Sequence, residues 1–317
     1  MSVLNVTVEK VEQITDVVKR FTFVQDNGEA LPKFSGGSHV VVSMDINGRT
    51  HRNPYSLMSS PANTDSYQIA VRRQDKSRGG SVFMHDQVKP GTKLTITYPV
   101  NLFAINRLGK KHILVAGGIG ITPFMSQIAD LNRLGADYEL HYAYRSSEHA
   151  AFREQLEELC GDRVHFYVEG DGTRIDFGDL LGQQPLGTHA YVCGPEPMVK
   201  MMLLTAKYLG WPSNHVHSEQ FLAPPVGDEF TVVLNQSAKE IVVPGDMSML
   251  EAMEEAGVDA PFLCRGGACG RCELDVLETD GALLHHDHYL SDAEKAAGNK
   301  IMPCVSRAKC TRLVVNL

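Results

Sequence analysis

The stretch Cys264–Cys272, with the sequence CRGGACGRC, places three of the chain's seven cysteines within nine residues. Gly266, Gly267 and Gly270 allow the backbone of this stretch to wrap tightly and to aim its amide groups at the sulfurs. Five of the seven cysteines lie in the last fifth of the chain. In a compartment that keeps thiols reduced, such cysteines are more plausibly ligands than disulfide partners. The stretch therefore predicts a metal-binding loop.

The spacing Cys264-x4-Cys269-x2-Cys272, followed by Cys304 after 31 residues, resembles that of plant-type [2Fe-2S] ferredoxins. Four thiolates also suit a structural zinc ion, but zinc sites usually pair two short cysteine knuckles, and Cys304 has only Cys310 near it. We therefore predict that these four cysteines bind an iron-sulfur cluster. Cys310 is expected to be a half-exposed strand residue outside the ligand set.

On either side of this loop, short apolar runs such as FTVVLN, KEIVVP, CELDVLE and LVVNL predict a mostly β module over residues 230–317, with one helix in MSMLEAMEEAG. Proline, glycine and charge in LAPPVGDE predict a linker, placed at 224–229. The motif HHDH at residues 285–288 could ligate a metal, although such a motif is more often a solvated loop. We expect the solvated loop.

Further upstream, strands alternate with helical stretches, which predicts an α/β domain with a parallel sheet over residues 106–223. In HILVAGGIGITP, glycines end an apolar strand and the next helix opens directly, a turn that lets a pyrophosphate approach the backbone. Glycines also end strands for purely steric reasons. The residues concerned are Gly117, Gly118, Gly120, Thr122 and Pro123.

A second signal in this domain is AYVCGPEPMV, which places Cys193, Gly194 and Pro195 at the carboxyl end of another strand, the edge of an α/β sheet where ligands bind. A lone cysteine on an apolar strand is more often part of the core. Together the two signals predict a nicotinamide dinucleotide site. Arg145 and Ser146 follow another strand of the sheet and could hold a 2′-phosphate, which leaves NADPH open beside NADH.

The first domain, residues 1–105, shows short alternating runs separated by turn residues, which predicts an antiparallel β-barrel with one short helix in SVFMHDQV. Tyr55 offers a flat ring to an aromatic cofactor, and Ser56 offers a donor or acceptor. The turn Gly79-Gly80-Ser81 begins the helix and could take a phosphate. Taken alone, these residues are a tyrosine in a strand and a capped helix.

Composition excludes several classes of protein. The chain of 317 residues is 43% hydrophobic and 21% charged, as is ordinary for a globular protein of two or three domains. Its formal charge of −8 provides no basic footprint for nucleic acid, although it could form an acidic docking face or simply maintain solubility. The first residues lack a secretory signal, and no apolar run reaches the roughly 18 residues of a membrane span. We expect a cytoplasmic protein.

In order along the chain, YSL, SRGGS, AGGIGITP, CGP and the cysteine spacing resemble the phthalate dioxygenase reductase family. HYAYRSSEHAA, YLSDAEKA and CVSRAK look most like its carnitine monooxygenase reductase branch. The resemblance implies an FMN domain, an NAD domain and a plant-type, β-grasp ferredoxin domain in that order. It also implies an oxidoreductase that carries electrons singly from NADH to a Rieske-type oxygenase. A dinucleotide-sensing module stabilised by zinc and a flavin reductase acting on small acceptors are the alternatives.

The resemblance also assigns roles to residues. Tyr55 and Ser56 would line the isoalloxazine, with Ser56 near flavin N5, and the nicotinamide would lie near Cys193. Val71 and Arg72 would run beside the ring, and Gly79, Gly80 and Ser81 would bind the flavin phosphate. The family usually has arginine two places before the tyrosine, whereas this chain has asparagine there and Arg52 one place earlier. Arg52 is therefore a candidate to bind the flavin phosphate only because it lies one place from the position of the family's arginine.

Overall fold

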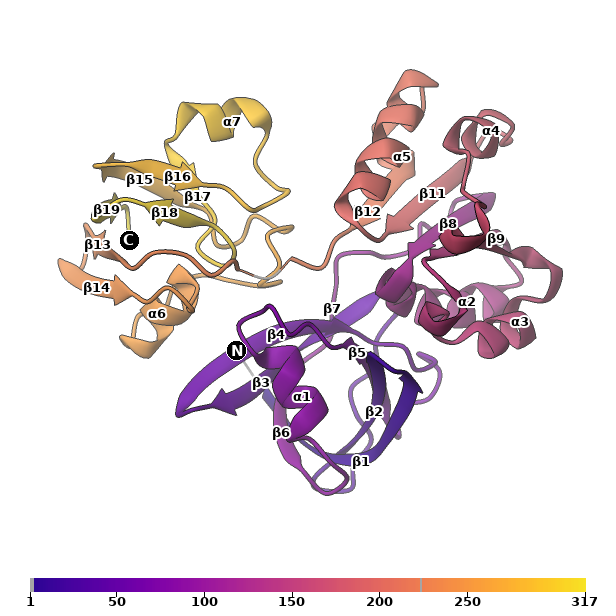
Figure 1. Ribbon diagram of the computed structural model, residues 1–317, viewed down its shortest axis with the longest axis horizontal. Coiled ribbons are helices and arrows are strands. Elements are labelled where there is room, and N and C mark those ends of the chain that lie inside the picture. Colours follow the sequence, from indigo (N-terminus) through magenta and orange to yellow (C-terminus); the bar gives the residue numbers. More distant parts are fainter. Residues whose placement is uncertain (1–2, 223) are drawn as a thin grey trace. The chain divides into compact units, whose positions relative to one another are not determined.

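The computed structural model describes residues 3–222 and 224–317 (Figure 1). Among these residues the chain forms two compact units. The first comprises residues 3–42, Tyr55–Arg73 and Phe83–Gln220. The second comprises Ser43–Pro54, Gln74–Val82 and the C-terminal part from Phe221 onward. Two segments of the N-terminal sheet region thus belong to the same unit as the C-terminal module, and the predicted domain boundaries stay predictions.

The N-terminal sheet has the strand order β4-β3-β6-β1-β2-β5, with β7 paired to β3. β1 pairs antiparallel with both β2 and β6, and its residues Leu4, Val6 and Val8 alternate into the core. A short helix, α1 (Gly80–Asp86), forms where SVFMHDQV predicts it. The strands are β1 (Val3–Thr15), β2 (Val18–Gln25), β3 (Ser38–Ile46), β4 (Arg49–Ser56), β5 (Tyr67–Arg72), β6 (Lys93–Thr97) and β7 (Val100–Asn101).

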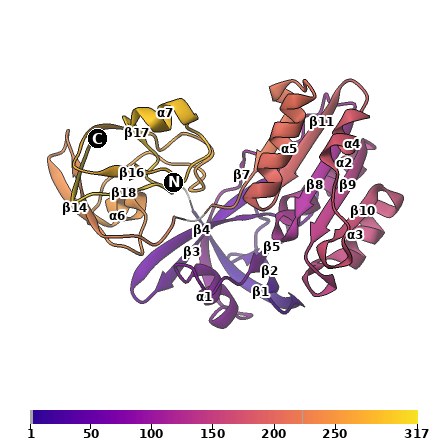
Figure 2. The same ribbon diagram turned by 45° about the horizontal axis from the view of Figure 1, so that its top comes forward.

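The middle of the chain forms a parallel sheet with the order β10-β9-β8-β11-β12. Its helices are α2 (Thr122–Leu134), α3 (Arg153–Cys160), α4 (Phe177–Gly182) and α5 (Glu196–Tyr208). Figure 2 shows the strands with these helices beside them. The strands are β8 (Lys111–Gly117), β9 (Asp137–Tyr144), β10 (Val164–Val168), β11 (Thr188–Cys193) and β12 (Val216–Glu219).

Alternate residues of β8 enter two different cores, as a sheet covered on both faces requires. Leu114 belongs to the cluster that includes Phe124 of α2 and Leu156 of α3. Ile113 belongs to the cluster that includes Leu181 of α4 and Val199 of α5. The chain leaves β8 toward β9 and β10 and later returns to β11 on the other side. The strand order therefore reverses between β8 and β11, the position where open α/β sheets bind ligands.

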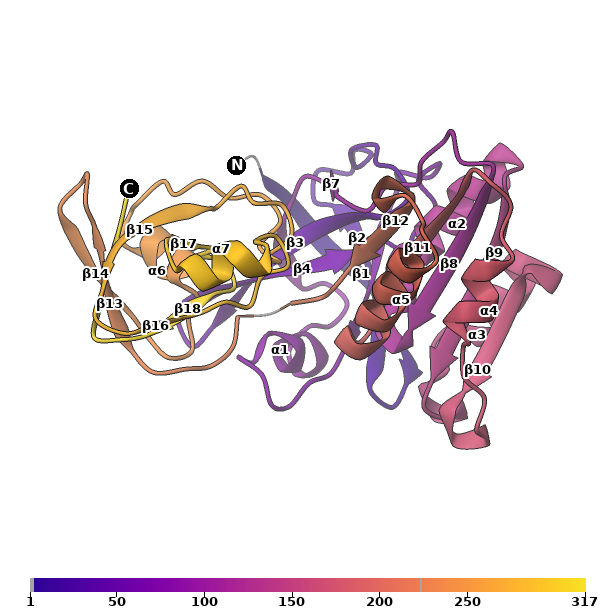
Figure 3. The ribbon, with the colours of Figure 1, turned by 90° about the horizontal axis from the view of Figure 1, so that it is seen from above.

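The C-terminal module is built on a mixed sheet of order β14-β13-β19-β15-β17, with a separate two-stranded antiparallel sheet of β16 and β18 (Figure 3). β13 and β19 are parallel, and two helices, α6 (Met249–Glu255) and α7 (Asp292–Ala297), each begin with a serine-glutamate capping box. The strands are β13 (Phe230–Leu234), β14 (Lys239–Val243), β15 (Leu274–Thr279), β16 (Ala282–Leu284), β17 (Lys300–Ile301), β18 (Arg307–Lys309) and β19 (Arg312–Val315).

The predicted fold class is confirmed: an antiparallel sheet, a parallel α/β domain and a β-grasp module follow one another. Short elements that the sequence patterns do not predict are α4, α7, β12, β16 and β18, because three to six residues carry too little periodicity. None of the described helices combines the length and the apolar character needed to cross a bilayer.

Candidate functional site

The four predicted cluster ligands come together in the C-terminal module. Cys264, Cys269 and Cys272 lie in the loop between α6 and β15, and Cys304 lies between β17 and β18. The Sγ atoms of Cys272 and Cys304 are 3.3 Å apart, although 31 residues separate them in the chain. Cys264 and Cys269 also share a hydrogen bond between their side chains. The fold therefore brings together four cysteine sulfurs from two separate segments of the chain.

Backbone amides point at these sulfurs, as a cluster of negative charge requires. The amide of Gly266 donates to Cys264 Sγ at 3.3 Å, and that of Arg271 donates to Cys269 Sγ at 3.5 Å. The hydrogen bond from Cys269, helped by backbone amides, lowers the pKa of Cys264 to about 5. The hydrogen bond with Cys272 raises the pKa of Cys304, and burial acts in the same direction. The same hydrogen bond lowers the pKa of Cys272. One thiol of each pair is thus the more readily deprotonated, so the loop is suited to ligating a metal.

The burial of the four cysteines is unequal. Cys264, Cys272 and Cys304 are buried, whereas Cys269 is partly exposed. Cys310 is partly exposed as expected, but it lies between β18 and β19, so the expectation of a strand residue is wrong. It interacts with Thr279 and Asp280. Four converging thiols with inward-pointing amides fit a [2Fe-2S] cluster held by cysteine alone.

The two glycine signals of the parallel-sheet domain meet at the carboxyl ends of β8 and β11. A Cβ atom built at Gly120 would lie 2.2 Å from the carbonyl oxygen of Cys193, and one at Gly117 would lie 2.6 Å from Cδ of Pro195. Gly118 has a φ of +54°, which a side chain rarely adopts. The glycines therefore let two turns from distant parts of the chain pack backbone against backbone. The cradle they form lies at the position where the strand order reverses.

Cys193 is fully buried at the end of β11, opposite Glu219 of β12 in the strand register. Burial raises the pKa of the Cys193 thiol well above its ordinary value, and the nearby charge of Glu219 acts in the same direction. Cys193 is therefore a neutral thiol at physiological pH. Such a group can pack against a ring but cannot act as a thiolate nucleophile.

In the same unit, Tyr55 and Ser56 end β4, and Val71 and Arg72 end β5. Ser56 is 4% exposed, and its Oγ has no hydrogen-bond partner among the residues that the structure describes. A buried hydroxyl without a partner is costly unless a ligand satisfies it. This orphaned hydroxyl fits the predicted contact with flavin. The carbonyl of Val71 is 2.8 Å from His85 Nε2, so this edge of β5 is already anchored to α1.

Arg52 and the turn at Gly79, Gly80 and Ser81 belong to the second unit. A Cβ atom built at Gly80 would lie 2.4 Å from Nδ2 of the Asn53 side chain, so the turn packs closely on β4. The Ser81 hydroxyl accepts a hydrogen bond from the amide of Gln74. The Arg52 guanidinium donates to Glu254 of α6 over 3.1 Å. Its predicted contact with the flavin phosphate stays a prediction.

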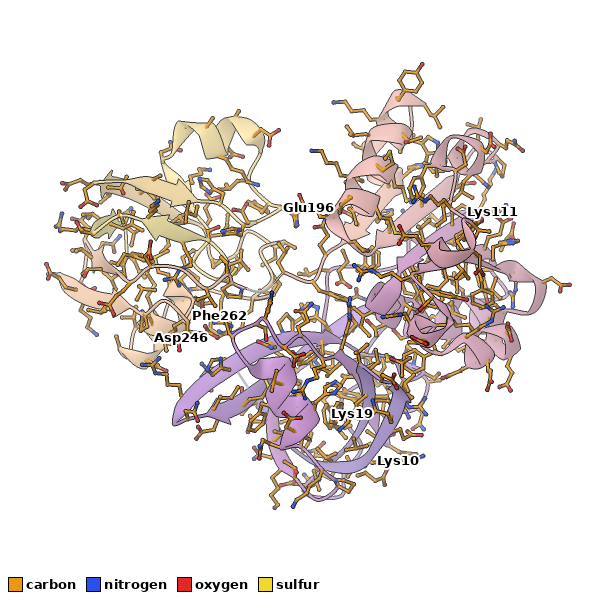
Figure 4. The ribbon with its side chains drawn as sticks, viewed as in Figure 1. Lys10, Lys19, Lys111, Glu196, Asp246 and Phe262 are labelled. Carbon is orange, nitrogen blue, oxygen red and sulfur yellow. The ribbon has the colours of Figure 1, made fainter. Side chains whose placement is uncertain are left out.

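Sequence reasoning missed an ion-pair network around α6. Glu254 binds Arg52 and also Arg265, the residue directly after the predicted ligand Cys264. The Arg265 guanidinium lies 4.0 Å from the ring centroid of Phe262, the residue labelled in Figure 4. Glu251 binds Arg78 with both side chains almost fully buried. The capping-box pattern at Ser248 and Glu251 was the only local signal for these acids.

The HHDH motif at residues 285–288 is less exposed to solvent than expected. Asp287 is 2% exposed, so the interpretation of the motif as a solvated loop is wrong at this residue. Apart from the cysteine loop, one group of described residues lies close enough together to be a metal candidate: the ligand atoms of Glu139, His141 and His165 are within 4.8 Å of one another. Their carboxylate already binds Lys111 at 2.7 Å. Arg145 is exposed after β9, and the Ser146 hydroxyl lies 2.8 Å from His149 Nδ1.

Three family models match successive parts of the chain. Residues 5–105 match the oxidoreductase FAD-binding domain, and residues 232–309 match the 2Fe-2S iron-sulfur cluster binding domain. Residues 97–216 match the N-terminal domain of dimethylamine monooxygenase subunit DmmA-like proteins. The fold, the four sulfurs and these matches define a flavin- and iron-sulfur-dependent oxidoreductase, as the sequence predicts.

Relatives extend over the whole chain. Carnitine monooxygenase reductase subunits from Acinetobacter baumannii and Escherichia coli are 46% and 45% identical to it, each over 98% of this chain and over 96% and 98% of their own lengths. A solved structure of phthalate dioxygenase reductase, 33% identical, superposes with a TM-score of 0.89 and covers 100% of this chain and 98% of its own. The chain belongs to the phthalate dioxygenase reductase family. The predicted likeness to the carnitine monooxygenase reductases is confirmed.

Proposed function

We propose that this protein is the NADH-dependent FMN and [2Fe-2S] reductase component of an oxygenase, to which it passes electrons one at a time. The observation that carries the proposal is the convergence of Cys264, Cys269, Cys272 and Cys304 in a chain that also holds a flavin domain and a dinucleotide cradle. When bound, the flavin takes an electron pair from the nicotinamide, and the cluster carries single electrons onward.

The residues of the chain bind and orient these groups. We propose that Gly117, Gly118 and Gly120 leave room for the dinucleotide pyrophosphate, next to the amino end of α2 at Thr122 and Pro123. Cys193, Gly194 and Pro195 would pack beside the nicotinamide. Ser56 would supply its orphaned hydroxyl to the flavin ring, with Tyr55, Val71 and Arg72 around it. None of these side chains needs to act as an acid or base.

The flavin and the nucleotide are proposed to be FMN and NADH, in line with the family resemblance. Arg145 is exposed where a 2′-phosphate could reach it, so a comparison of NADH with NADPH tests the nucleotide directly. Heat release of the flavin followed by chromatography distinguishes FMN from FAD. The domain limits proposed are 1–105, 106–223, a linker at 224–229, and 230–317, and the proposed location is the cytoplasm.

The partner proposed is a Rieske-type oxygenase, with carnitine monooxygenase as the first candidate because two carnitine monooxygenase reductase subunits share 45–46% identity with this chain. A second candidate rests on a different relative. The heme-dependent oxidative N-demethylase beta subunit of Ectopseudomonas mendocina is 43% identical over 100% of this chain. Mixing the reductase with each type of oxygenase and measuring substrate-coupled NADH oxidation separates these partners.

The test of the reductase itself is Cys269→Ser, with Cys310→Ser as the matched control. Loss of one ligand should abolish reduction of a one-electron protein acceptor but leave NADH-driven ferricyanide reduction, which the flavin performs. Cys310→Ser, in the same module but outside the ligand set, should retain both activities. If Cys269→Ser lost both activities equally, or neither, the division of labour between flavin and cluster would be wrong. Colourless, iron-free protein would favour the zinc-stabilised module.

A further inference from the structure

The HHDHYL segment, residues 285–290, holds a buried carboxylate. The Asp287 side chain has no exposed surface, and its two oxygens accept hydrogen bonds from the amide of Leu290 at 2.8 Å and from the Ser306 hydroxyl at 3.2 Å. Lys295 of α7 donates to the Asp287 carbonyl at 2.6 Å and lies 3.9 Å from the carboxylate. A buried charge persists only when it is paired and hydrogen-bonded, so this residue is held in one place.

One side of the segment lies against the loop that carries three of the cluster ligands. The amide of His288 donates to the carbonyl of Gly267 at 3.0 Å. A Cβ atom built at Gly267 would lie 3.1 Å from Asp287 Cα, and one at Gly270 would lie 2.2 Å from Cζ of Tyr289. Both glycines have positive φ, so the loop needs glycine there for conformation as well as for space. The segment therefore packs directly on the cysteine loop.

The other side of the segment holds the strand-to-strand connection that carries the fourth ligand. Ser306, two residues after Cys304, donates its hydroxyl to Asp287 and accepts the amide of His286 at 3.2 Å. Val305, next to Cys304, would lie 2.7 Å from a Cβ atom at Gly267. The same short segment thus contacts both pieces of chain that supply sulfur.

We propose that Asp287 is a positioning residue that holds the Cys264–Cys272 loop and the Cys304 connection at the separation that the cluster requires. The inference rests on the proposed [2Fe-2S] site and adds to it an anchor outside the ligand set. The cluster can bridge the two ligand-bearing pieces of chain only where their sulfurs are already close. The Asp287 carboxylate ties the HHDHYL segment to the Cys304 connection through Ser306, and the His288 amide of the same segment ties it to the cysteine loop at Gly267. Without the Asp287 carboxylate, the cysteine loop and the Cys304 connection are free to move apart, and the cluster is released more readily.

The experiment compares Asp287→Asn with Asp280→Asn in full-length, cluster-loaded protein. Asp280 is an exposed carboxylate of the same module that accepts the amides of Thr311 and Arg312 at 3.0 and 3.1 Å. It therefore controls for loss of a carboxylate that stabilises the module away from the ligands. The readouts are the bleaching rate of the visible absorbance under excess chelator, the electron paramagnetic resonance spectrum of the reduced protein, and the thermal unfolding of the iron-free protein.

For Asp287→Asn we expect bleaching about tenfold faster than in the wild type, the effect of weakening hydrogen bonds to a buried charged group. We also expect a broadened or shifted resonance spectrum, while Asp280→Asn keeps the wild-type rate and spectrum. Wild-type bleaching and spectrum in Asp287→Asn would overturn the inference. It would also be overturned if both variants bleached faster in proportion to their loss of thermal stability, because a merely structural role predicts that pattern.

Ser306→Ala provides the second variant if Asp287→Asn fails to fold, because it removes the hydroxyl's hydrogen bonds to Asp287 and to the amide of His286 and leaves the carboxylate in place. It should bleach at an intermediate rate, and a wild-type rate would again overturn the inference. Iron-free wild-type protein after anaerobic reconstitution would overturn the proposed function and this inference with it. A stable cluster in the wild type and equally in both variants would overturn the inference alone.

Discussion

Gly120→Ala tests whether the dinucleotide site depends on the close packing of the turn after β8 against the turn after β11. Gly120 does not have a positive φ, so an alanine there is not strained by its backbone conformation. Its Cβ atom, however, would lie 2.2 Å from the carbonyl oxygen of Cys193 and 2.6 Å from the carbonyl carbon. The obstacle is backbone rather than a flexible side chain. The turn after β8 and the turn after β11 must therefore move apart.

The size of the effect follows from these distances. Ordinary van der Waals contact begins at 3.4 Å, so the two turns must separate by about 1.2 Å. Overpacking of this kind typically costs about 1–3 kcal/mol of stability. A misplacement of about 1 Å between reacting groups can cost about 10²-fold in rate. We therefore expect flavin reduction by NADH to slow by about a hundredfold, while chemical reduction of flavin and cluster by dithionite is unchanged.

The assay is stopped-flow absorbance of the flavin after mixing with NADH, beside thermal unfolding to establish that the variant is folded. Gly182→Ala is the matched control, because it lies at the end of α4 in the same domain and a Cβ atom there has no neighbour within 4 Å. Its reduction rate should equal that of the wild type. A folded Gly120→Ala protein that reduces its flavin within twofold of the wild-type rate would refute the reasoning.

Three further predictions concern the thiol, the histidines and the buried ion pair. Cys193→Ala should slow flavin reduction by NADH with little change in NADH affinity, and an unchanged stopped-flow rate would reject this role. Burial lowers the pKa of His39 and of His112 to about 4, whereas the pKa of a histidine in the unfolded chain is about 6.5. Between these two pH values the unfolded chain binds more protons than the folded protein. The free energy of unfolding therefore decreases as the pH falls through this range. Each of the two histidines should lower the free energy of unfolding by up to about 3 kcal/mol as the pH falls. Equal urea unfolding midpoints at pH 7.5 and pH 5 would contradict this prediction. Glu251→Gln leaves Arg78 buried without its partner and should cost about 3–5 kcal/mol in urea unfolding, whereas less than 1 kcal/mol would show the pair to be dispensable.

Much of the candidate site could be predicted because its signals are local. The spacing of Cys264, Cys269 and Cys272 lies within one loop, and its glycines are needed for the turn that the loop makes. The glycine turn after β8 follows an apolar strand directly, so its place at the edge of a parallel sheet could be inferred. Only the resemblance to plant-type ferredoxins predicts Cys304 as a ligand, because the 31 residues between Cys272 and Cys304 do not indicate where the chain returns.

The remaining site residues depended on contacts that no local pattern records. Asp287 looks like part of a polar loop, and only the folded module shows that Ser306 and Leu290 bury its carboxylate. Arg52 is a reasonable phosphate ligand by position, yet the structure pairs it with Glu254, which is about two hundred residues away in the chain.

The order of the three modules, the periods of their strands and helices, and the cysteine spacing within one loop can be read from the amino-acid sequence alone. These properties depend on neighbouring residues, whose side chains alternate across a strand or recur along a helix. The folded chain alone reveals that the hydroxyl of Ser56 is buried with no hydrogen-bond partner among the described residues, that Gly120 lies against Cys193, and that two distant sulfurs approach to 3.3 Å. Such contacts arise when separate segments pack together, because burial and close approach are properties of the assembled core.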